Sequence, residues 1–77
     1  MKIKKYTVKK YANECSMTVD DVQCGFSKKI KTVYADDNSA VAGCEFEDGT
    51  FGCFGCKMDC EDLASYDEVV TAIKCGM

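Results

Sequence analysis

Apolar and polar residues alternate most clearly in the middle of the chain, over residues 40–47. One face of this extended segment carries the small and apolar side chains Ala40, Ala42, Cys44 and Phe46. The other face carries Val41, Gly43, Glu45 and Glu47. A period of two of this kind predicts a β-strand with one buried face.

The pair Asp48-Gly49 follows this strand and predicts a tight two-residue turn, because glycine adopts a positive φ without steric cost. Residues 50–54 then form the second strand of a hairpin. Counting outward from the turn pairs Phe46 with Phe51. We therefore expect both phenylalanines on the inner face of the sheet.

Further segments carry weaker patterns. Residues 31–35 (KTVYA) predict a third strand. Residues 16–25 predict a short helix, because Thr18 and Asp21 resemble an N-cap pair. Residues 2–11 (KIKKYTVKKY) favour a strand whose lysines would protect a sheet edge, although a helix fits their spacing almost as well.

The last predicted element is a C-terminal helix. Ser65 followed by Glu68 is typical of a capping box, and acidic residues near a helix start favour its dipole. The apolar stripe that would cover a sheet consists of Leu63, Val69, Val70 and Ile73. Lys74 suits the last turn of this helix, and Gly76 suits the position after it.

Together these elements predict an α+β fold with a single domain over residues 1–77. The expected architecture is a small antiparallel three-stranded meander with one or two short helices packed on it. Leucine, isoleucine, valine and phenylalanine total 15 residues, about a fifth of the chain, which approaches the range where folding unaided fails. Small domains of this kind need a disulfide, a metal or a partner. We expect a cysteine-ligated metal to staple the fold.

The chain has seven cysteines, and four of them lie close together in the sequence. Cys44, Cys53, Cys56 and Cys60 follow the spacing C-x8-C-x2-C-x3-C. The predicted hairpin places Cys44 directly opposite Cys53, with Cβ atoms roughly 4.5–5.5 Å apart. Cys56 and Cys60 follow on the turn that leaves the second strand. Four converging thiolates suit a tetrahedral metal, most simply Zn²⁺, so we predict a zinc-stabilised domain with these four ligands.

Other cysteine chemistry stays open. Cys15, Cys24 or Cys75 could replace one ligand, most simply Cys75 if the last helix folds over the hairpin; otherwise they are small buried side chains. An iron–sulfur cluster also uses four cysteines, although this spacing matches neither common ferredoxin pattern. Disulfides are disfavoured, because the charged start MKIKKYTVKKY lacks the apolar segment of a signal peptide and predicts a cytoplasmic protein. No apolar run is long enough to span a membrane.

The residue inventory argues against catalysis. The chain has no histidine, which removes the commonest general base and catalytic metal ligand. Four thiolates would close the zinc site, whereas catalytic zinc keeps one position open for water. Asp59 and Glu61 flank Cys60 but are more simply part of a solvated face. We therefore predict a structural metal, no catalytic residues and no enzymatic activity.

Charge is strongly divided along the chain, although the formal net charge is only −3. Residues 1–35 carry eight lysines and three acids, and residues 36–77 carry two lysines and ten acids, so the balances are +5 and −8. The basic start, interleaved with Tyr6 and Tyr11, could contact a phosphate backbone. The acidic half could instead occupy the basic groove of a protein that binds nucleic acid. The absence of arginine weighs against base readout.

In its small size, its arginine-free start MKIKKYTVKKY, its acidic half and the cluster CFGCKMDC, the chain resembles the small proteins that phages encode to disable host defences, including anti-CRISPR inhibitors. That group includes zinc-containing members but has no shared fold or signature, so no functional residue is carried over. The resemblance implies an inhibitor that binds a bacterial nuclease such as Cas9 in the host cytoplasm and blocks DNA loading or cleavage. The alternative is a zinc-ribbon-like module that binds nucleic acid or the transcription machinery.

Overall fold

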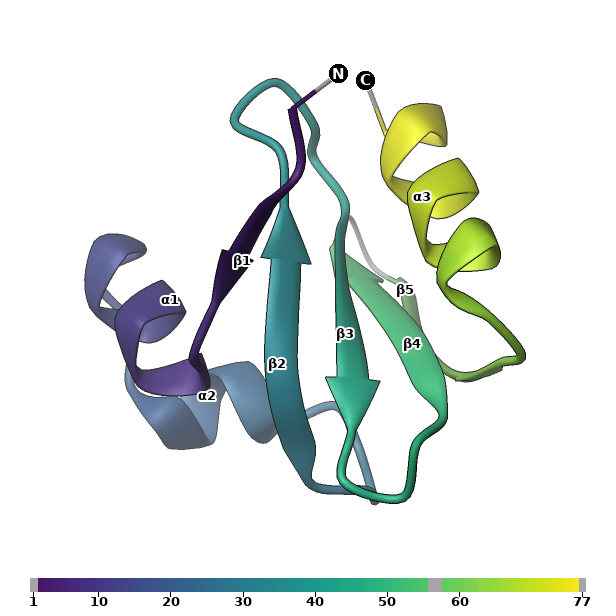
Figure 1. Ribbon diagram of the computed structural model, residues 1–77. Helices are drawn as coiled ribbons and strands as arrows, with labels where there is room; N and C mark the ends of the chain where they lie inside the picture. Colours follow the sequence, from purple (N-terminus) through teal and green to yellow (C-terminus); the bar gives the residue numbers. More distant parts are fainter. Residues whose placement is uncertain (1, 56–57, 77) are drawn as a thin grey trace.

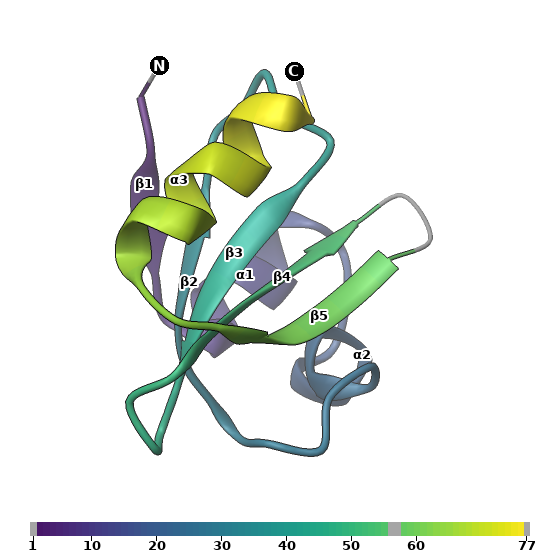
Figure 2. The same ribbon diagram turned by 90° about the vertical axis from the view of Figure 1, so that its right-hand side faces the viewer.

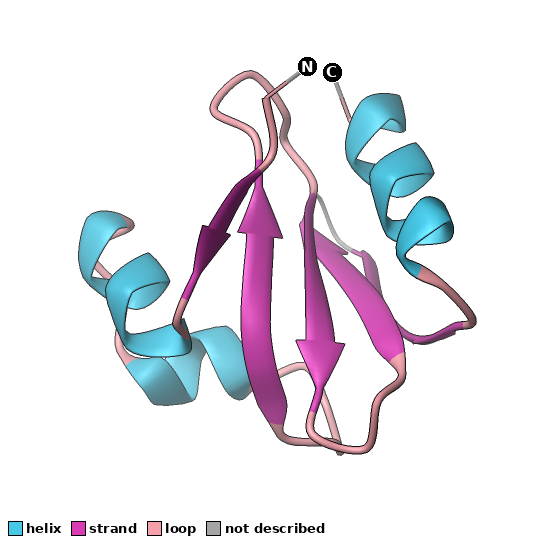
Figure 3. Ribbon diagram, viewed as in Figure 1, coloured by secondary structure: helices cyan, strands magenta, loops and turns pink. Residues whose placement is uncertain are grey.

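The computed structural model describes residues 2–55 and 58–76. Within these residues the chain forms a five-stranded antiparallel sheet and three helices (Figures 1 and 3). In chain order the elements are β1 (Lys4–Tyr6), α1 (Val8–Glu14), α2 (Val19–Gln23), β2 (Ile30–Ala35), β3 (Ala42–Phe46), β4 (Phe51–Gly55), β5 (Met58–Leu63) and α3 (Tyr66–Cys75). The strand order in the sheet is β1-β2-β3-β4-β5, so each strand pairs with its neighbours in sequence.

Helices cover both faces of the sheet. The helices α1 and α2 lie on one face, and α3 crosses the other face against β3 and β4 (Figures 1 and 2). We call these the α1/α2 face and the α3 face. The strands β1 and β5 form the two edges of the sheet. The lysine-rich N-terminal segment therefore lies at one edge, and the acidic segment that includes β5 lies at the other.

The α+β class is confirmed, but the predicted three-stranded meander is too small. The strands expected at 31–35, 40–47 and 50–54 correspond to β2, β3 and β4, which form the centre of the sheet. One further strand extends the sheet on each side. The sequence prediction does not include β5 (MDCEDL), because its apolar alternation covers only residues 58–61 and breaks at Asp62.

The N-terminal segment 2–11 divides at Thr7 into a strand and a helix. Before Thr7, β1 pairs with β2 as the edge of the sheet. After it, α1 begins, because the Thr7 side-chain oxygen accepts a hydrogen bond from the backbone N–H of Lys10 at 3.2 Å. This N-cap explains why both the strand and the helix interpretation fit part of the pattern.

The two predicted helix caps have different outcomes. In α2, Thr18 accepts from the backbone N–H of Asp21 (3.0 Å) and Asp21 accepts from that of Thr18 (2.9 Å), so this capping box is confirmed. In α3, Ser65 is the N-cap residue, but its side chain makes no capping hydrogen bond. The Glu68 carboxylate accepts instead from the backbone N–H of Ala64.

The hairpin between β3 and β4 has a three-residue loop, 47–49, in place of the predicted two-residue turn. The backbone N–H of Phe46 donates to the Thr50 carbonyl at 2.8 Å, and the N–H of Gly49 donates to the Phe46 carbonyl at 3.1 Å. Gly49 has a φ of +89°, which glycine adopts without strain. This longer loop shifts the pairing of the two strands by one residue.

The shifted register separates the two phenylalanines that we expected on one face. Phe46 is fully buried on the α1/α2 face, where its ring lies 5.2 Å from that of Phe26 in a T-shaped arrangement. Phe51 is half-buried on the α3 face, with its ring 6.5 Å from that of Tyr66. The expectation of a shared inner face is wrong, because a one-residue slip moves a side chain to the other side of a strand.

Each face of the sheet has its own core. The buried cluster on the α1/α2 face consists of Ala12, Val22, Ile30, Val33, Ala42, Cys44 and Phe46. On the α3 face, Val69 and Ile73 are fully buried, which confirms these two residues of the predicted apolar stripe. Val70 is half-buried, and Leu63 belongs to β5 and not to the helix. A side chain at Gly43 would collide with Val69, so this glycine allows α3 to lie close to β3.

Candidate functional site

Cys53 and Cys60 are brought together by the pairing of β4 with β5. The two residues are direct partners across the strands, so their side chains lie on the same face, with Cβ atoms roughly 4.5–5.5 Å apart. Burial raises the pKa of the Cys53 thiol first, and the neighbouring Cys60 thiol raises it further. This pair joins two of the predicted zinc ligands.

Cys44 lies apart from this pair. It opposes Gly52, not Cys53, and the register therefore turns its side chain to the α1/α2 face. There it is fully buried in the core, and burial, followed by the charge of Cys53, raises its pKa to about 12. The predicted pairing of Cys44 with Cys53 is wrong, because the hairpin loop has three residues.

The remaining cysteines are Cys56, the fourth predicted ligand, and the three possible replacements Cys15, Cys24 and Cys75. Cys56 lies outside the described residues. Within residues 2–55 and 58–76, no group of three or more cysteine, aspartate or glutamate side chains is arranged to hold a metal ion. Cys15, Cys24 and Cys75 are exposed, so the expectation that they are small buried side chains is wrong. The zinc site stays a prediction, with Cys53 and Cys60 as its adjacent pair.

The Asp62 carboxylate lies beside the thiol pair. The Cys60 thiol donates a hydrogen bond to the Asp62 carboxylate at 2.9 Å, and this bond is the main reason that the pKa of Cys60 is raised. Reactive cysteines have the opposite setting, with positive groups that stabilise the thiolate. Both thiols are therefore protonated at neutral pH in the absence of a cation. A bound divalent cation would reverse this preference, because it stabilises thiolates.

The acidic edge of the sheet continues from these thiols into the start of α3. Five acidic residues and no lysine occur from residue 59 to residue 68, and we call them the acidic edge: Asp59, Glu61, Asp62, Asp67 and Glu68. The ion pairs of the described residues, Lys4 with Asp37 and Lys28 with Asp48, involve none of them. Four of the five are exposed and Glu61 is half-buried.

One residue of the acidic edge also fixes β5 in place. The Glu61 carboxylate accepts hydrogen bonds from the Ser27 backbone N–H (3.0 Å) and hydroxyl (2.6 Å) in the segment after α2. These bonds lower the pKa of Glu61. Asp59 lies on the same side of β5, because a side chain at Gly25 would collide with its carboxylate. The predicted solvated face is confirmed for Asp59, which is exposed, but not for Glu61, which is half-buried and bonded to Ser27. The signal for a larger acidic surface in the sequence is the run of acids without lysine over residues 59–68.

The opposite edge carries the basic residues of the N-terminal segment. They are Lys2, Lys4, Lys5, Lys9 and Lys10. All five are exposed, and Lys4 forms an ion pair with Asp37 at 3.0 Å. We call this set the basic edge. Lys4 and Lys5 lie in the edge strand β1, and Lys9 and Lys10 lie in the first turn of α1.

No helix within residues 2–55 and 58–76 is long and apolar enough to cross a membrane. No protein-family model, no curated protein and no solved structure matches the chain. Inference about function therefore starts from the Cys53–Cys60 pair, the acidic edge and the basic edge.

Proposed function

We propose that this chain is a non-catalytic protein that binds and inhibits a larger bacterial protein, a nuclease of the Cas9 type, by occupying its basic nucleic-acid groove. The observation that carries the proposal is the acidic edge. Five carboxylates lie on β5 and the adjacent helix start, without a lysine among them in the sequence. Such a surface attracts a groove lined by lysine and arginine and speeds association with it.

The shape of the acidic edge supports this choice of partner. Successive side chains of a strand point to opposite faces, so Asp59 and Glu61 share one face of β5 at a spacing of about 6.6 Å, and Asp62 projects from the other face. The acidic edge therefore presents carboxylates on both sides of the strand to a basic groove. The inhibitor would block DNA loading or cleavage by excluding the nucleic acid and would need no catalytic group of its own.

Zinc belongs to the proposal as a structural cofactor. Cys53 and Cys60 would supply two thiolates, and a tetrahedral Zn²⁺ needs four ligands. Cys56 and Cys44 are the other two predicted ligands, and Cys44 would have to leave the core of the α1/α2 face to join them. The ion would hold β5 to β4 and so stabilise the strand that carries the acidic edge.

The test compares two double variants with equal net charge. The first, Asp62→Asn with Asp67→Asn, removes two exposed carboxylates of the acidic edge. The control, Asp20→Asn with Glu47→Gln, removes one acid from the first turn of α2 and one from the hairpin loop. Binding to a guide-loaded Cas9-type nuclease is measured by biolayer interferometry at low and moderate salt.

We expect the first variant to bind at least about tenfold more weakly than the control at low salt, with a smaller difference at moderate salt because of screening. Equal loss in both variants would show that net charge alone matters. Absence of binding by the unaltered protein to such nucleases would refute the partner.

The basic edge supports a second function, a module that binds nucleic acid directly. Five exposed lysines with Tyr6 and Tyr11 nearby could contact phosphates. A gel-shift series with duplex DNA tests this. Binding that weakens steeply with salt, and that is lost on Lys9→Gln with Lys10→Gln, would favour the second function over the first.

A further inference from the structure

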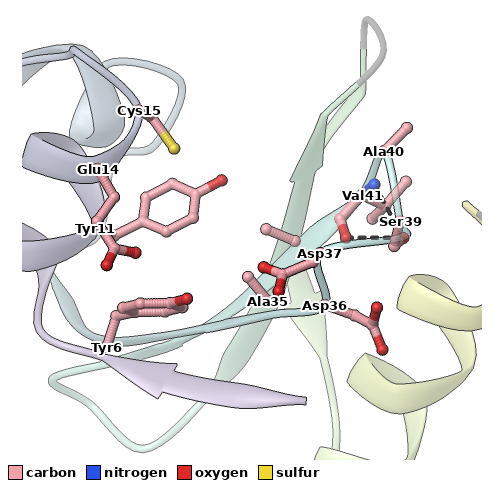
Figure 4. A pocket seen from close by; sticks show the side chains of 11 residues that line it. Tyr6, Tyr11, Glu14, Cys15, Ala35, Asp36, Asp37, Ser39, Ala40 and Val41 are labelled. Carbon is pink, nitrogen blue, oxygen red and sulfur yellow. Dashed lines mark hydrogen bonds between the residues drawn. The ribbon is translucent and has the colours of Figure 1, made fainter. Parts of the chain in front are cut away.

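A cavity of about 290 Å³ lies between the N-terminal segment and the connection from β2 to β3 (Figure 4). Tyr6, Tyr11, Glu14 and Cys15 line it from the side of β1 and α1, and residues 35–37 and 39–42 line it from the other side. Figure 4 shows both phenol hydroxyls and the Asp37 carboxylate directed into the space between these segments. Its position is distinct from the thiol pair and the acidic edge.

Aromatic rings form one wall of the cavity. The rings of Tyr6 and Tyr11 are 5.7 Å apart in an edge-to-face arrangement. Phe54 packs against Tyr11 from behind, with ring centroids 5.8 Å apart. Both tyrosines also pack against the buried cluster of the α1/α2 face. The wall is therefore held by the core and does not have to form when a ligand arrives.

The carboxylates around the cavity differ in how far they are already neutralised. Asp36 is buried and accepts hydrogen bonds from the backbone N–H groups of Lys2 and Asn38, each at 2.8 Å. Asp37 is paired with Lys4 at 3.0 Å. Glu14 takes part in neither of the ion pairs formed by the described part of the chain. Among the described residues, Glu14 thus has no ion-pair partner, although the charge of Lys4 acts on it from a greater distance.

The two tyrosines stay neutral beside this charge. Burial raises the pKa of Tyr6, and the negative charge of Glu14 raises it further. Burial also raises the pKa of Tyr11 to about 12, with a second contribution from Cys15. The cavity therefore presents uncharged phenol groups, whose oxygens can accept hydrogen bonds, beside carboxylates, and this combination attracts an organic ammonium group.

We propose that this cavity binds a primary alkylammonium group, carried by a free amine or by a lysine side chain of another protein. The ammonium would lie near Glu14 and Asp37, and its alkyl chain would lie against the rings of Tyr6 and Tyr11. Mg²⁺ and Ca²⁺ fit less well, because they require a shell of oxygen ligands with little room for aromatic rings. The volume is at the small end for ligand sites and suits a short amine better than a nucleotide.

The first experiment is an NMR titration of the whole protein with n-butylammonium chloride, with n-butanol as the neutral control of similar shape. We expect saturable shifts of the backbone amides of Tyr6, Tyr11, Glu14 and Cys15 with the amine and none with the alcohol. Equal shifts with both probes, shifts spread over the acidic edge, or tighter binding of Mg²⁺ would overturn the proposal.

Variants test the two halves of the site. Glu14→Gln should raise the Kd for n-butylammonium about three- to fivefold, the contribution expected of a partly exposed ion pair. Glu47→Gln, the same change in the hairpin loop, should leave the Kd unchanged. Tyr6→Leu, checked for folding by its amide spectrum, should weaken binding while keeping every charge. An unchanged Kd in both Glu14→Gln and Tyr6→Leu would refute the site.

Repeating the titration with Nα-acetyl-lysine methylamide identifies the source of the amine. Shifts of the same amides at a similar Kd would assign the cavity to a lysine side chain of a protein. Shifts with n-butylammonium alone would assign it to free amines. The residues that carry this proposal are not those of the acidic edge, so loss of nuclease binding and loss of amine binding can be told apart.

Discussion

The two faces of the sheet are filled in different ways. The α1/α2 face has a broad core of aliphatic and aromatic side chains centred on Phe46, with Phe26 packed edge-to-face on it. The α3 face has a narrow contact, in which Val69 and Ile73 lie over β3 and the glycine at position 43 brings the helix close. A sheet in a chain of this size can thus bury both faces with few large side chains.

The cysteines divide between the faces in the same way. Cys44 is a packing residue of the broad core, where it has no access to solvent. Cys53 and Cys60 lie side by side on the other face, where Cys53 is buried and Cys60 is half-buried next to the acidic edge. Without a bound ion, Cys44 and the Cys53–Cys60 pair therefore lie in different surroundings.

The largest expected effect comes from the broad core. Phe46→Ala should lower the free energy of unfolding by about 3–5 kcal/mol, because it leaves a cavity among fully buried neighbours. Phe51→Ala, on the narrow face, should cost about 1–2 kcal/mol, since the loss scales with buried apolar area. Urea unfolding followed by circular dichroism measures both. Similar losses would contradict the contrast between the faces.

Serine substitutions test whether Cys44 and Cys60 contribute differently to stability. In protein prepared under chelation, Cys44→Ser should cost about 1–3 kcal/mol, because it buries a hydroxyl in an apolar core. Cys60→Ser, at a half-buried position, should change the stability by less than about 0.5 kcal/mol.

In protein loaded with zinc, the cost of Cys60→Ser should rise well above its value under chelation if the proposed cofactor is bound. Cys60→Ser and Cys53→Ser would then lose the metal and much of the stability that it provides. Elemental analysis and thermal unfolding measure both, with Cys24→Ser as an exposed control. A colourless protein with about one zinc per chain would also exclude an iron–sulfur cluster. No metal in any preparation, with unchanged melting temperatures, would remove zinc from the proposal.

The smallest effect concerns the bond between β5 and the segment after α2. The Ser27 hydrogen bonds lower the pKa of Glu61 below its ordinary value of 4.5, so the folded state favours the carboxylate. This contribution is present above that value and is lost as the pH falls through the lower pKa of the folded state. Glu61→Gln should therefore flatten the stability profile below about pH 4.5. An unchanged acid profile would show that β5 does not depend on this bond.

Much of the fold follows from local signals in the sequence. The Thr18–Asp21 pair caps α2, and Val69 and Ile73 of the predicted stripe are buried in α3. Alternation over residues 40–47 marks β3. The N-terminal edge strand is harder to recognise, because Thr7 ends a three-residue strand and starts a helix within one lysine-rich segment.

The candidate site is less accessible to sequence reasoning. An Asp-Gly pair closes loops of two or three residues, and the choice decides whether Cys44 faces Cys53 or the core. The partner of Cys53 depends on β5, whose acidic side chains give no strand signal. The cavity beside Tyr6 and Tyr11 joins residues 6–15 to residues 35–42. It therefore exists only after the sheet has formed.

The order of strands along the sheet bears on how quickly the molecule can assemble. Because every strand pairs with the next one in the chain, the sheet can grow outward from the hairpin of β3 and β4. The long connection between paired strands, which contains α1 and α2, is needed only when β1 joins. Topologies with such local pairing have low loop-closure entropy and fold fast. A newly synthesised chain would spend little time with its strands exposed to other unfolded chains.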